Sequence, residues 1–254
     1  MAFAHRLADV AAEAIRPLFR TNLALDRKHQ GIDATAIVTQ ADHAAEEAMR
    51  RLILETYPDH GILGEERGRE NEGARLTWVL DPIDGTKAFV TGFPTWGTLI
   101  ALNDGGRPVL GVCNQPHTGE RFAGDARGTT LNGRRLATRP CPALAGATLA
   151  ATSFEMFGEG AKREAFATLY RQAGLRRLGG DCYAYCMLAH GLIDIVVEAD
   201  LAPWDIQALI PIVEGAGGVV TGWDGGPAAA GGCVVACGDR RLHAEVLPVL
   251  RRAL

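Results

Sequence analysis

The sequence predicts a mixed chain in which an antiparallel β region is followed by alternating strands and helices. Apolar residues recur at helical spacing through residues 3–20 and again after Asp42. Short β-type runs separated by Gly, Asn and Asp turns fill residues 77–137, which is the pattern of an antiparallel meander. Beyond Pro142 strand and helix patterns alternate, which is typical of an α/β layer.

In the first half, the expected elements begin with two amphipathic helices. Asp42 is the expected N-cap of the second helix, which ends at residues 57–59. A short strand at 62–63 follows, and the charged, Gly-rich residues 67–75 are expected to form a surface loop. A further strand at 77–80 ends at an Asp-Pro step, before the hairpin strands 98–102 and 108–112.

The second half is expected to alternate strands with helices. We predict strands at 147–152, 192–198, 218–221 and 233–237, and helices at 161–173, 181–190, 205–216 and from about 240. The composition changes near 136–142. We therefore divide the chain into an α+β half, residues 1–138, and an α/β half, residues 139–254.

Composition and charge exclude several classes of protein. The 254 residues are 47% hydrophobic and 22% charged, which fits a globular protein and not a disordered one. The net charge of −4 gives no basic field for nucleic acid or a membrane surface, and we expect neither as a partner. No run of 18 apolar residues occurs, and the amphipathic N-terminus differs from a signal peptide. The six cysteines are expected to be reduced thiols of a cytoplasmic protein.

The strongest chemical signal is an apolar strand that ends in Asp81 and Asp84. Pro82 restricts the turn, so both carboxylates can point to one side, and Gly85 leaves room for a ligand. If a helical turn starts at Thr86, the N–H groups of Gly85 and Thr86 would hold an anion. Two carboxylates next to an anion site repel the anion unless a cation bridges them. Mg²⁺ would do so, because it binds carboxylates together with substrate phosphate. The alternative interpretation is a plain surface turn.

Three further acidic elements lie at strand ends or helix starts. Glu65 and Glu66 follow a short strand, Asp205 opens an apolar helix, and Asp42 opens another. Taken singly, each has a structural explanation, as a solvated turn, a helix-dipole partner or a helix cap. Taken together with Asp81 and Asp84, they could supply the several carboxylates that two metal ions need to activate water for attack on phosphorus.

These motifs together resemble the inositol monophosphatase superfamily. The resemblance is carried by Gly-Glu-Glu at 64–66, WVLDPIDGT at 78–86, and Trp-Asp at 204–205 followed by an apolar helix and glycines at 215–218. The motifs occur in the family's chain order and cover essentially the whole sequence. The resemblance implies the sugar-phosphatase fold, a layered α-β-α-β-α sandwich, with Mg²⁺-dependent hydrolysis of small-molecule phosphate esters. It also implies a homodimer.

The resemblance assigns a role to each matching residue. The implied metal ligands for two to three Mg²⁺ ions are Glu65, Asp81 as the bridging ligand, the carbonyl of Ile83, Asp84 and Asp205, with a third, weaker ion near Glu65 and Glu66. The implied catalytic set is Thr86, Asp42 and Glu65, in which Thr86 and Asp42 orient and deprotonate the attacking water. The amides of Gly85 and Thr86 would bind the phosphate.

Within the superfamily, the run Lys87–Leu102, with its Pro-Thr-Trp-Gly, looks most like the histidinol-phosphate phosphatase branch. Residues 33–39 depart from the more usual Ser-Pro-Val-Thr but keep Thr39. Glu198 matches a position that touches the organic part of the substrate, and Asp181 aligns with a position that is small and neutral in inositol phosphatases. Both, together with Asp205, are expected to bind the substrate. Two carboxylates gain little from a neutral polyol but form charge-assisted hydrogen bonds with a cationic amino alcohol. Asp181 could also cap the helix at 181–190, and the two roles are compatible.

Two other functions stay open. A phosphatase of the same superfamily could act on inositol 1-phosphate, or on sugar or nucleotide bisphosphates. Alternatively, a non-catalytic relative could serve as a binding or regulatory protein, and such a protein is expected to lack a metal ligand. The sequence favours histidinol-phosphate phosphatase activity over both, because every implied ligand is present and the pocket is acidic.

Overall fold

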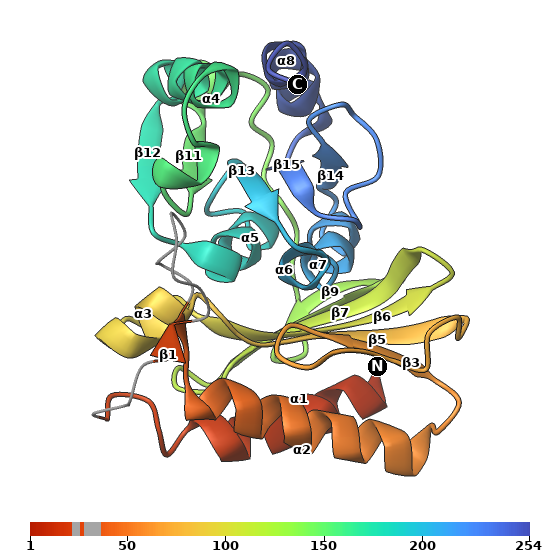
Figure 1. Cartoon of the computed structure of the whole chain (residues 1–254). Coiled ribbons are helices and arrows are strands. Elements are labelled where there is room, and N and C mark those ends of the chain that lie inside the picture. Colours follow the sequence, from red (N-terminus) through yellow and green to blue (C-terminus); the bar gives the residue numbers. More distant parts are fainter. Residues whose placement is uncertain (22–25, 28–36) are drawn as a thin grey trace.

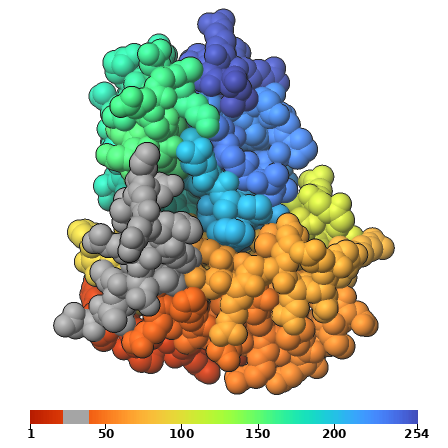
Figure 2. Space-filling view, in the orientation of Figure 1, coloured from red at the N-terminus to blue at the C-terminus, as the bar shows by residue number. Residues whose placement is uncertain are grey.

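The computed structural model describes residues 1–21, 26–27 and 37–254. It stacks five layers, in which two helices, an eight-stranded sheet, a set of middle helices, a five-stranded sheet and two outer helices follow one another (Figure 1). The first half of the chain forms the lower part of the molecule and the second half the upper part (Figure 2). This is the predicted layered sandwich. Across the described ranges, no helix combines the length and the apolar character needed to cross a membrane.

The lowest layer is formed by α1 (Ala2–Ile15) and α2 (Gln40–Thr56). The first helix is shorter than the expected 3–20. The expectation that Asp42 is the N-cap is wrong, because Thr39 caps α2 by accepting the Ala41 N–H, at 3.1 Å. Asp42 instead completes a capping box, and its carboxylate accepts the N–H of Thr39 at 2.8 Å.

The first sheet has the strand order β10-β9-β8-β7-β6-β5-β3-β4. Its strands are β3 (Gly61–Gly64), β4 (Gly68–Glu70), β5 (Leu76–Asp84), β6 (Gly97–Asp104), β7 (Arg107–Gln115), β8 (Glu120–Asp125), β9 (Gly128–Leu131) and β10 (Arg134–Arg135). The meander from β5 to β10 is confirmed. The expected loop at 67–75 contains β4, which pairs antiparallel with β3. The remaining strands, β1 (Asp26–Arg27) and β2 (Ile37–Val38), form a separate ribbon, and residues 33–36 lie outside the described part.

Strand β5 extends four residues beyond its expected end at Leu80. Its pairing with β6 is irregular between Asp81 and Asp84, where Pro82 has no N–H to donate. The Thr98 hydroxyl holds this segment by donating to the Pro82 carbonyl at 2.8 Å. Irregular pairing of this kind turns side chains away from the regular alternation. Gly85 then takes a left-handed φ of 83°, and the short helix α3 (Thr86–Thr91) begins, at the residue where the sequence analysis considered a helical turn.

The second sheet has the order β12-β11-β13-β15-β14. Its strands are β11 (Thr148–Ala151), β12 (Leu175–Leu178), β13 (Ile195–Leu201), β14 (Val219–Gly222) and β15 (Gly232–Cys237). The sequence prediction missed β12, whose exposed Leu-Arg-Arg-Leu has no clear alternation. The predicted boundary at residues 138–139 falls between the last strand of the first sheet and the first strand of the second, and the division into two halves stays a proposal.

The helices of the second half occupy two layers. Outside the second sheet lie α4 (Ala161–Gln172) and α8 (Arg240–Arg251), and between the sheets lie α5 (Asp181–Ala189), α6 (Pro203–Ile206) and α7 (Leu209–Gly215) (Figure 1). The expected helix at 205–216 is therefore two helices. The break matters for the site because Asp205 then lies in the first turn of its own short helix.

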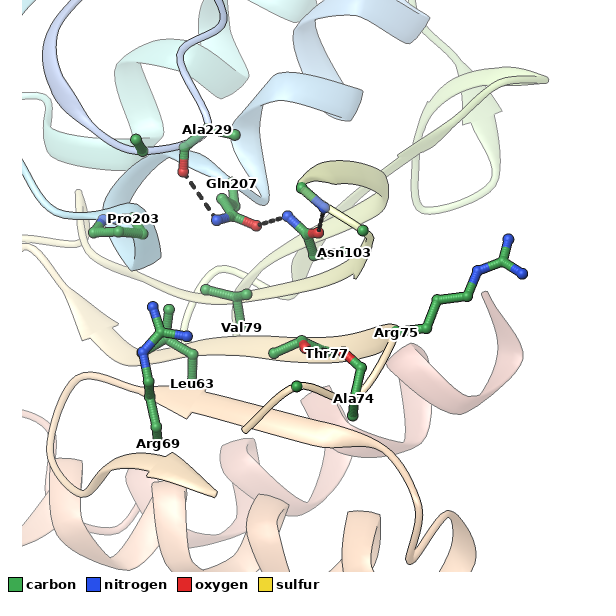
Figure 3. A pocket seen from close by; sticks show the side chains of 14 residues that line it. Leu63, Arg69, Ala74, Arg75, Thr77, Val79, Asn103, Pro203, Gln207 and Ala229 are labelled. Carbon is green, nitrogen blue, oxygen red and sulfur yellow. Dashed lines mark hydrogen bonds between the residues drawn. The ribbon is translucent and has the colours of Figure 1, made fainter. Parts of the chain in front are cut away.

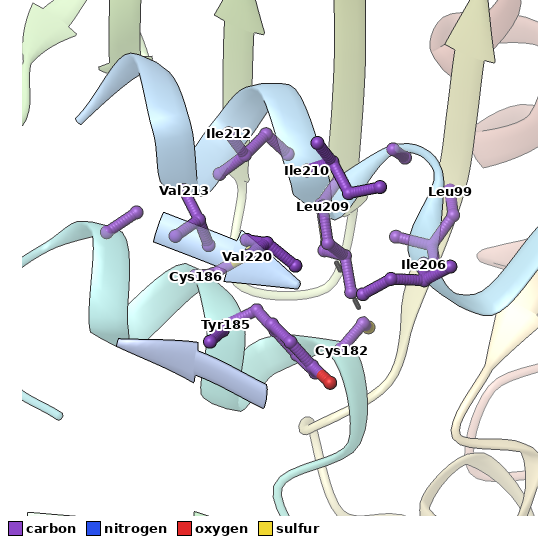
Figure 4. Packing of buried hydrophobic residues seen from close by; sticks show 14 of the residues in the cluster. Leu99, Cys182, Tyr185, Cys186, Ile206, Leu209, Ile210, Ile212, Val213 and Val220 are labelled. Atoms are coloured by element: carbon purple, nitrogen blue, oxygen red, sulfur yellow. Dashed lines mark hydrogen bonds between the residues drawn. The ribbon is translucent and has the colours of Figure 1, made fainter. Parts of the chain in front are cut away.

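The middle helices bury a continuous apolar core between the two sheets (Figure 4). Tyr185 and Cys182 of α5 pack there with Ile206 of α6 and Leu209 of α7. Helix α7 lies so close to the first sheet that a side chain on Gly111 would collide with the backbone of Ala208. This core fixes the helices that carry acidic residues at their starts.

Substituting Gly111→Ala tests this close packing. We expect the free energy of unfolding to fall by about 2 kcal/mol or more, because an added methyl group must displace backbone atoms. Chemical denaturation measures the change. The matched control is Gly146→Ala, because no atom lies within 4 Å of the position that its added carbon would take. Equal stability of the two variants would contradict the packing.

Candidate active site

Parallel pairing of β3 with β5 brings two acidic motifs together. The pairing places Gly64 opposite Leu80, and the Glu65 N–H donates to the Leu80 carbonyl at 3.2 Å. Glu65 and Asp81 are each the next residue after this pair, so both lie at the same edge of the sheet. Two motifs separated by 16 positions in the sequence thus share one end of the sheet.

Asp84 and Asp205 complete a carboxylate cluster with Asp81. One carboxylate oxygen from each of the three lies within 4.8 Å of the others. Asp205 is held by the Ala202 N–H, which donates to its Oδ2 at 2.7 Å. The Cys182 N–H, in the first turn of α5, donates to Asp84 Oδ2 at 2.7 Å. Three elements from both halves of the chain therefore orient this cluster.

The electrostatics of the cluster suit a bound cation. Burial, followed by the charges of Glu65, Asp84 and Asp205, raises the pKa of Asp81 well above its usual range. Burial and the charges of Asp205 and Asp181 raise the pKa of Asp84 in the same way. Asp81 Oδ1 is buried and has no hydrogen-bond partner. Converging carboxylates with an unsatisfied buried oxygen fit a hard divalent cation.

Thr86 and Asp42, the predicted catalytic pair, each hydrogen-bond to another residue and not to one another. The Thr86 hydroxyl donates to the Ile83 carbonyl at 3.1 Å. Asp42 Oδ2 accepts the Thr39 hydroxyl at 2.7 Å, and within the described part of the chain no hydrogen bond joins Asp42 to Thr86. Burial raises the pKa of Asp42 to about 6, and the charges of Glu66 and Glu65 add to this effect. The pairing of Thr86 with Asp42 stays a prediction.

Asp181 lies against Gly85, which is predicted to bind phosphate. A side-chain carbon on Gly85 would meet Asp181 Cβ at 3.1 Å. Asp181 is the first residue of α5, takes a φ of 44° and makes no capping hydrogen bond, so the capping role is not seen. Burial raises its pKa to about 6, opposed by the charge of Lys87. A buried acid with a raised pKa beside a carboxylate cluster is typical of a functional site.

Glu198 of β13 is buried, with 3% of its surface exposed. Its Oε1 accepts the Thr152 N–H at 3.0 Å, and its Oε2 accepts the Tyr185 hydroxyl at 3.0 Å. Burial raises its pKa to about 7, against these hydrogen bonds, and the charge of Asp181 adds to the rise. The two acids predicted to face the substrate are thus close enough to interact. Sequence reasoning assigned no role to Thr152 or Tyr185.

Sequence reasoning also missed Glu46, one helical turn after Asp42. It is fully buried, and its carboxylate accepts the N–H groups of Glu66 and Arg67 at 2.8 and 3.0 Å. Arg50, another turn along, donates to the same carboxylate at 2.7 Å. A signal was available: acids and a base at i, i+4 spacing on the apolar face of a helix are unusual.

A separate cavity of about 460 Å³ lies between the first sheet and α6 (Figure 3). It is lined by Leu63, Val79 and Pro203, among others, and by Gln207, which bonds the Asn103 amide at 2.7 Å and the Ala229 carbonyl at 2.9 Å. None of the predicted site residues lines it. The cavity is therefore separate from the carboxylate site.

Comparison with known proteins agrees with this geometry. A bifunctional phosphatase of Arabidopsis thaliana, IMPL2, is 43% identical and is aligned over 98% of this chain and 74% of its own length. A histidinol-phosphatase of Streptomyces coelicolor is 38% identical, over 98% of this chain and 96% of its own. A solved inositol monophosphatase from Zymomonas mobilis superposes with a TM-score of 0.88 at 45% identity, covering 98% and 96% of the two chains.

The family model described as the inositol monophosphatase family matches residues 1–254. The match spans both halves of the chain, including the strand end at Asp81, the helix start at Asp205 and the middle helices between them. Fold, motifs and relatives thus agree, and the chain belongs to the inositol monophosphatase family.

Proposed function

We propose that this phosphatase of the inositol monophosphatase family hydrolyses L-histidinol phosphate to L-histidinol and phosphate, with Mg²⁺, as a step in histidine biosynthesis. The observation that carries the proposal is the pairing of two acidic groups. The cluster of Asp81, Asp84 and Asp205 lies beside a second pair, Asp181 and Glu198, linked to it through Gly85. The first group suits a metal, and the second suits a cationic substrate.

The cation site is proposed to take two to three Mg²⁺ ions. Glu65, Asp81, Asp84, Asp205 and the Ile83 carbonyl are the residues that would hold them. The buried, unpartnered Asp81 Oδ1 supports a bridging role for this residue. Bound ions would neutralise charge on the phosphoryl group and the leaving oxygen, and would lower the pKa of a bound water.

The chain's own residues would position the reactants. Thr86 and Asp42, with Glu65, are proposed to orient the attacking water, and Asp42 to accept its proton. The pKa of about 6 at Asp42 supports this, because a base with a pKa near the working pH is the most effective. The amides of Gly85 and Thr86 are proposed to bind phosphate oxygens. This arrangement works through positioning and charge and needs no phosphoenzyme.

The acidic pocket is proposed to select the substrate by charge. The organic part of histidinol phosphate carries a primary ammonium group and an imidazole, whereas the organic part of an inositol phosphate carries only hydroxyl groups. Glu198 and Asp181 would each accept a charge-assisted hydrogen bond from the ammonium or the ring. Facing a neutral polyol, Glu198 would stay buried without a counter-charge, at a cost of several kcal/mol. The histidinol-phosphatase name of the Streptomyces coelicolor relative supports the same choice.

Inositol 1-phosphate is the second candidate substrate. The solved relative from Zymomonas mobilis, at 45% identity, is named an inositol monophosphatase. The proposal further expects a homodimer in the cytoplasm, without nucleic-acid or membrane partners. The net charge of −4 supports this expectation for the partners.

Substituting Asp84→Asn tests the metal site. Asn keeps an oxygen that can accept the Cys182 N–H, so we expect the fold to persist while cation binding weakens. Hydrolysis of L-histidinol phosphate, measured as kcat/KM, should fall by at least about a hundredfold. EDTA should abolish the wild-type activity and Mg²⁺ restore it. The control Asp59→Asn, on the exposed surface, should retain full activity. Hydrolysis that survives EDTA would overturn the mechanism.

Substituting Asp181→Asn tests the charge-based selection. Asn tolerates the left-handed φ at this position, so the backbone should not change. We expect kcat/KM to fall about 10- to 100-fold for L-histidinol phosphate but by less than threefold for myo-inositol 1-phosphate and adenosine 3′,5′-bisphosphate. The matched control is Asp200→Asn, an exposed aspartate that also has a positive φ, of 58°. A wild-type preference for either comparison ester would refute the role of this pocket.

A further inference from the structure

The loop that carries Glu65 and Glu66 is wrapped around one buried carboxylate from another element. Glu46 of α2 accepts the N–H of Glu66 through Oε2, at 2.8 Å, and the N–H of Arg67 through Oε1, at 3.0 Å. The side chain is fully buried. A carboxylate that receives two consecutive amides fixes the direction of that backbone, because both hydrogen bonds are charge-assisted.

The residue before the loop is adapted to this carboxylate. Gly64 lies so close to Glu46 that a side-chain carbon there would collide with the Glu46 carboxylate. Its φ is not in the left-handed region, so the close approach, and not backbone conformation, accounts for the glycine. Glu46 therefore contacts the chain on both sides of Glu65.

Arg50 forms an ion pair with the same carboxylate. Its Nε donates to Glu46 Oε1 at 2.7 Å, and its other nitrogens reach the Gly68 carbonyl and, at 3.2 Å, Glu70. Arg50 is itself buried, with 6% exposed, so the ion pair is shielded from water. The pair thus spans the loop from its start to the strand that follows it.

The sheet fixes this loop only at its two ends. Gly64 ends β3, Gly68 begins β4, and the Glu65 N–H donates to the Leu80 carbonyl at 3.2 Å. The N–H groups of Glu66 and Arg67, which lie between the two strands, donate to Glu46 instead. Glu46 therefore fixes the backbone that follows Glu65.

We propose that Glu46, paired with Arg50, is a positioning residue that holds the backbone of the loop after Glu65 in place beside the carboxylate cluster before the cation arrives. This inference rests on the metal site of the proposed function. Glu46 acts through the backbone and touches neither substrate nor cation. Residues that orient metal ligands typically change metal affinity by 10- to 100-fold when they are replaced.

The test uses Glu46→Gln and Glu46→Asp in the full chain. Gln replaces one of the two carboxylate oxygens with an NH₂ group, so it loses one of the two hydrogen bonds from the loop amides. Asp keeps the negative charge that pairs with Arg50, but its side chain is too short to reach the loop amides. Hydrogen exchange of the metal-free protein should accelerate at least about tenfold at the Glu66 and Arg67 amides. Calorimetric titration with Mg²⁺ should show affinity weakened about 10- to 100-fold. Saturating Mg²⁺ should restore the kcat of the variants for L-histidinol phosphate to within about threefold of the wild-type value.

The control is Glu47→Gln, the next residue of α2. Glu47 is an exposed acid whose carboxylate pairs with the Arg67 guanidinium at 2.8 Å. It therefore contacts a side chain of the same loop but not the loop's backbone amides. We expect its Mg²⁺ affinity and amide exchange to stay within twofold of wild type. Unchanged exchange and affinity in Glu46→Asp, or equal losses in Glu47→Gln, would overturn the inference. If Glu46→Gln fails to fold, Glu46→Asp decides the result.

The two proposals can fail separately. If the wild-type protein binds no Mg²⁺, the metal site of the proposed function is wrong, and amide exchange alone then decides whether Glu46 holds the loop. If the wild type binds Mg²⁺ and the Glu46 variants bind it equally well, the metal site stands and the positioning role is wrong.

Discussion

The site depends on the mutual repulsion of carboxylates that the fold forces into one small volume. Asp81, Asp84 and Asp205 converge within 4.8 Å, with Glu65 close enough to raise the pKa of Asp81. Removing such charges from water costs several kcal/mol for each ion unless an opposite charge compensates them. Folding therefore supplies an arrangement that is unfavourable by itself and that a divalent cation would relieve.

Elements from both halves of the chain oppose this repulsion. The parallel pairing of β3 with β5 fixes Glu65, and the irregular segment at Pro82 turns Asp81 and Asp84 toward one region. Backbone amides from α5 and α6 each hold one carboxylate of the cluster. The core of the middle helix layer ties these helices to both sheets. The same rigidity would let the site align a phosphate ester without large motion.

The sequence predicted most of the layers and the acidic cluster, because both are encoded locally. Helical spacing marks α1 and α2, and an apolar run ending in acidic residues marks β5 and Asp81. The rest depends on contacts between distant segments. From the sequence alone Asp42 looks like the N-cap of α2. In the structure Thr39 is the N-cap, because its side chain accepts the Ala41 N–H. The role of Glu46 depends on a loop that lies 20 residues away in the chain.

The most direct test of the central claim is a crystal structure grown with Mn²⁺, which replaces Mg²⁺ on oxygen ligands and scatters X-rays anomalously. The account predicts anomalous peaks between Asp81, Asp84 and Asp205, with at least one within bonding distance of Asp81 Oδ1. A map without a peak in this cluster, or with its strongest peak elsewhere on the molecule, would contradict the claim that these carboxylates form a cation site.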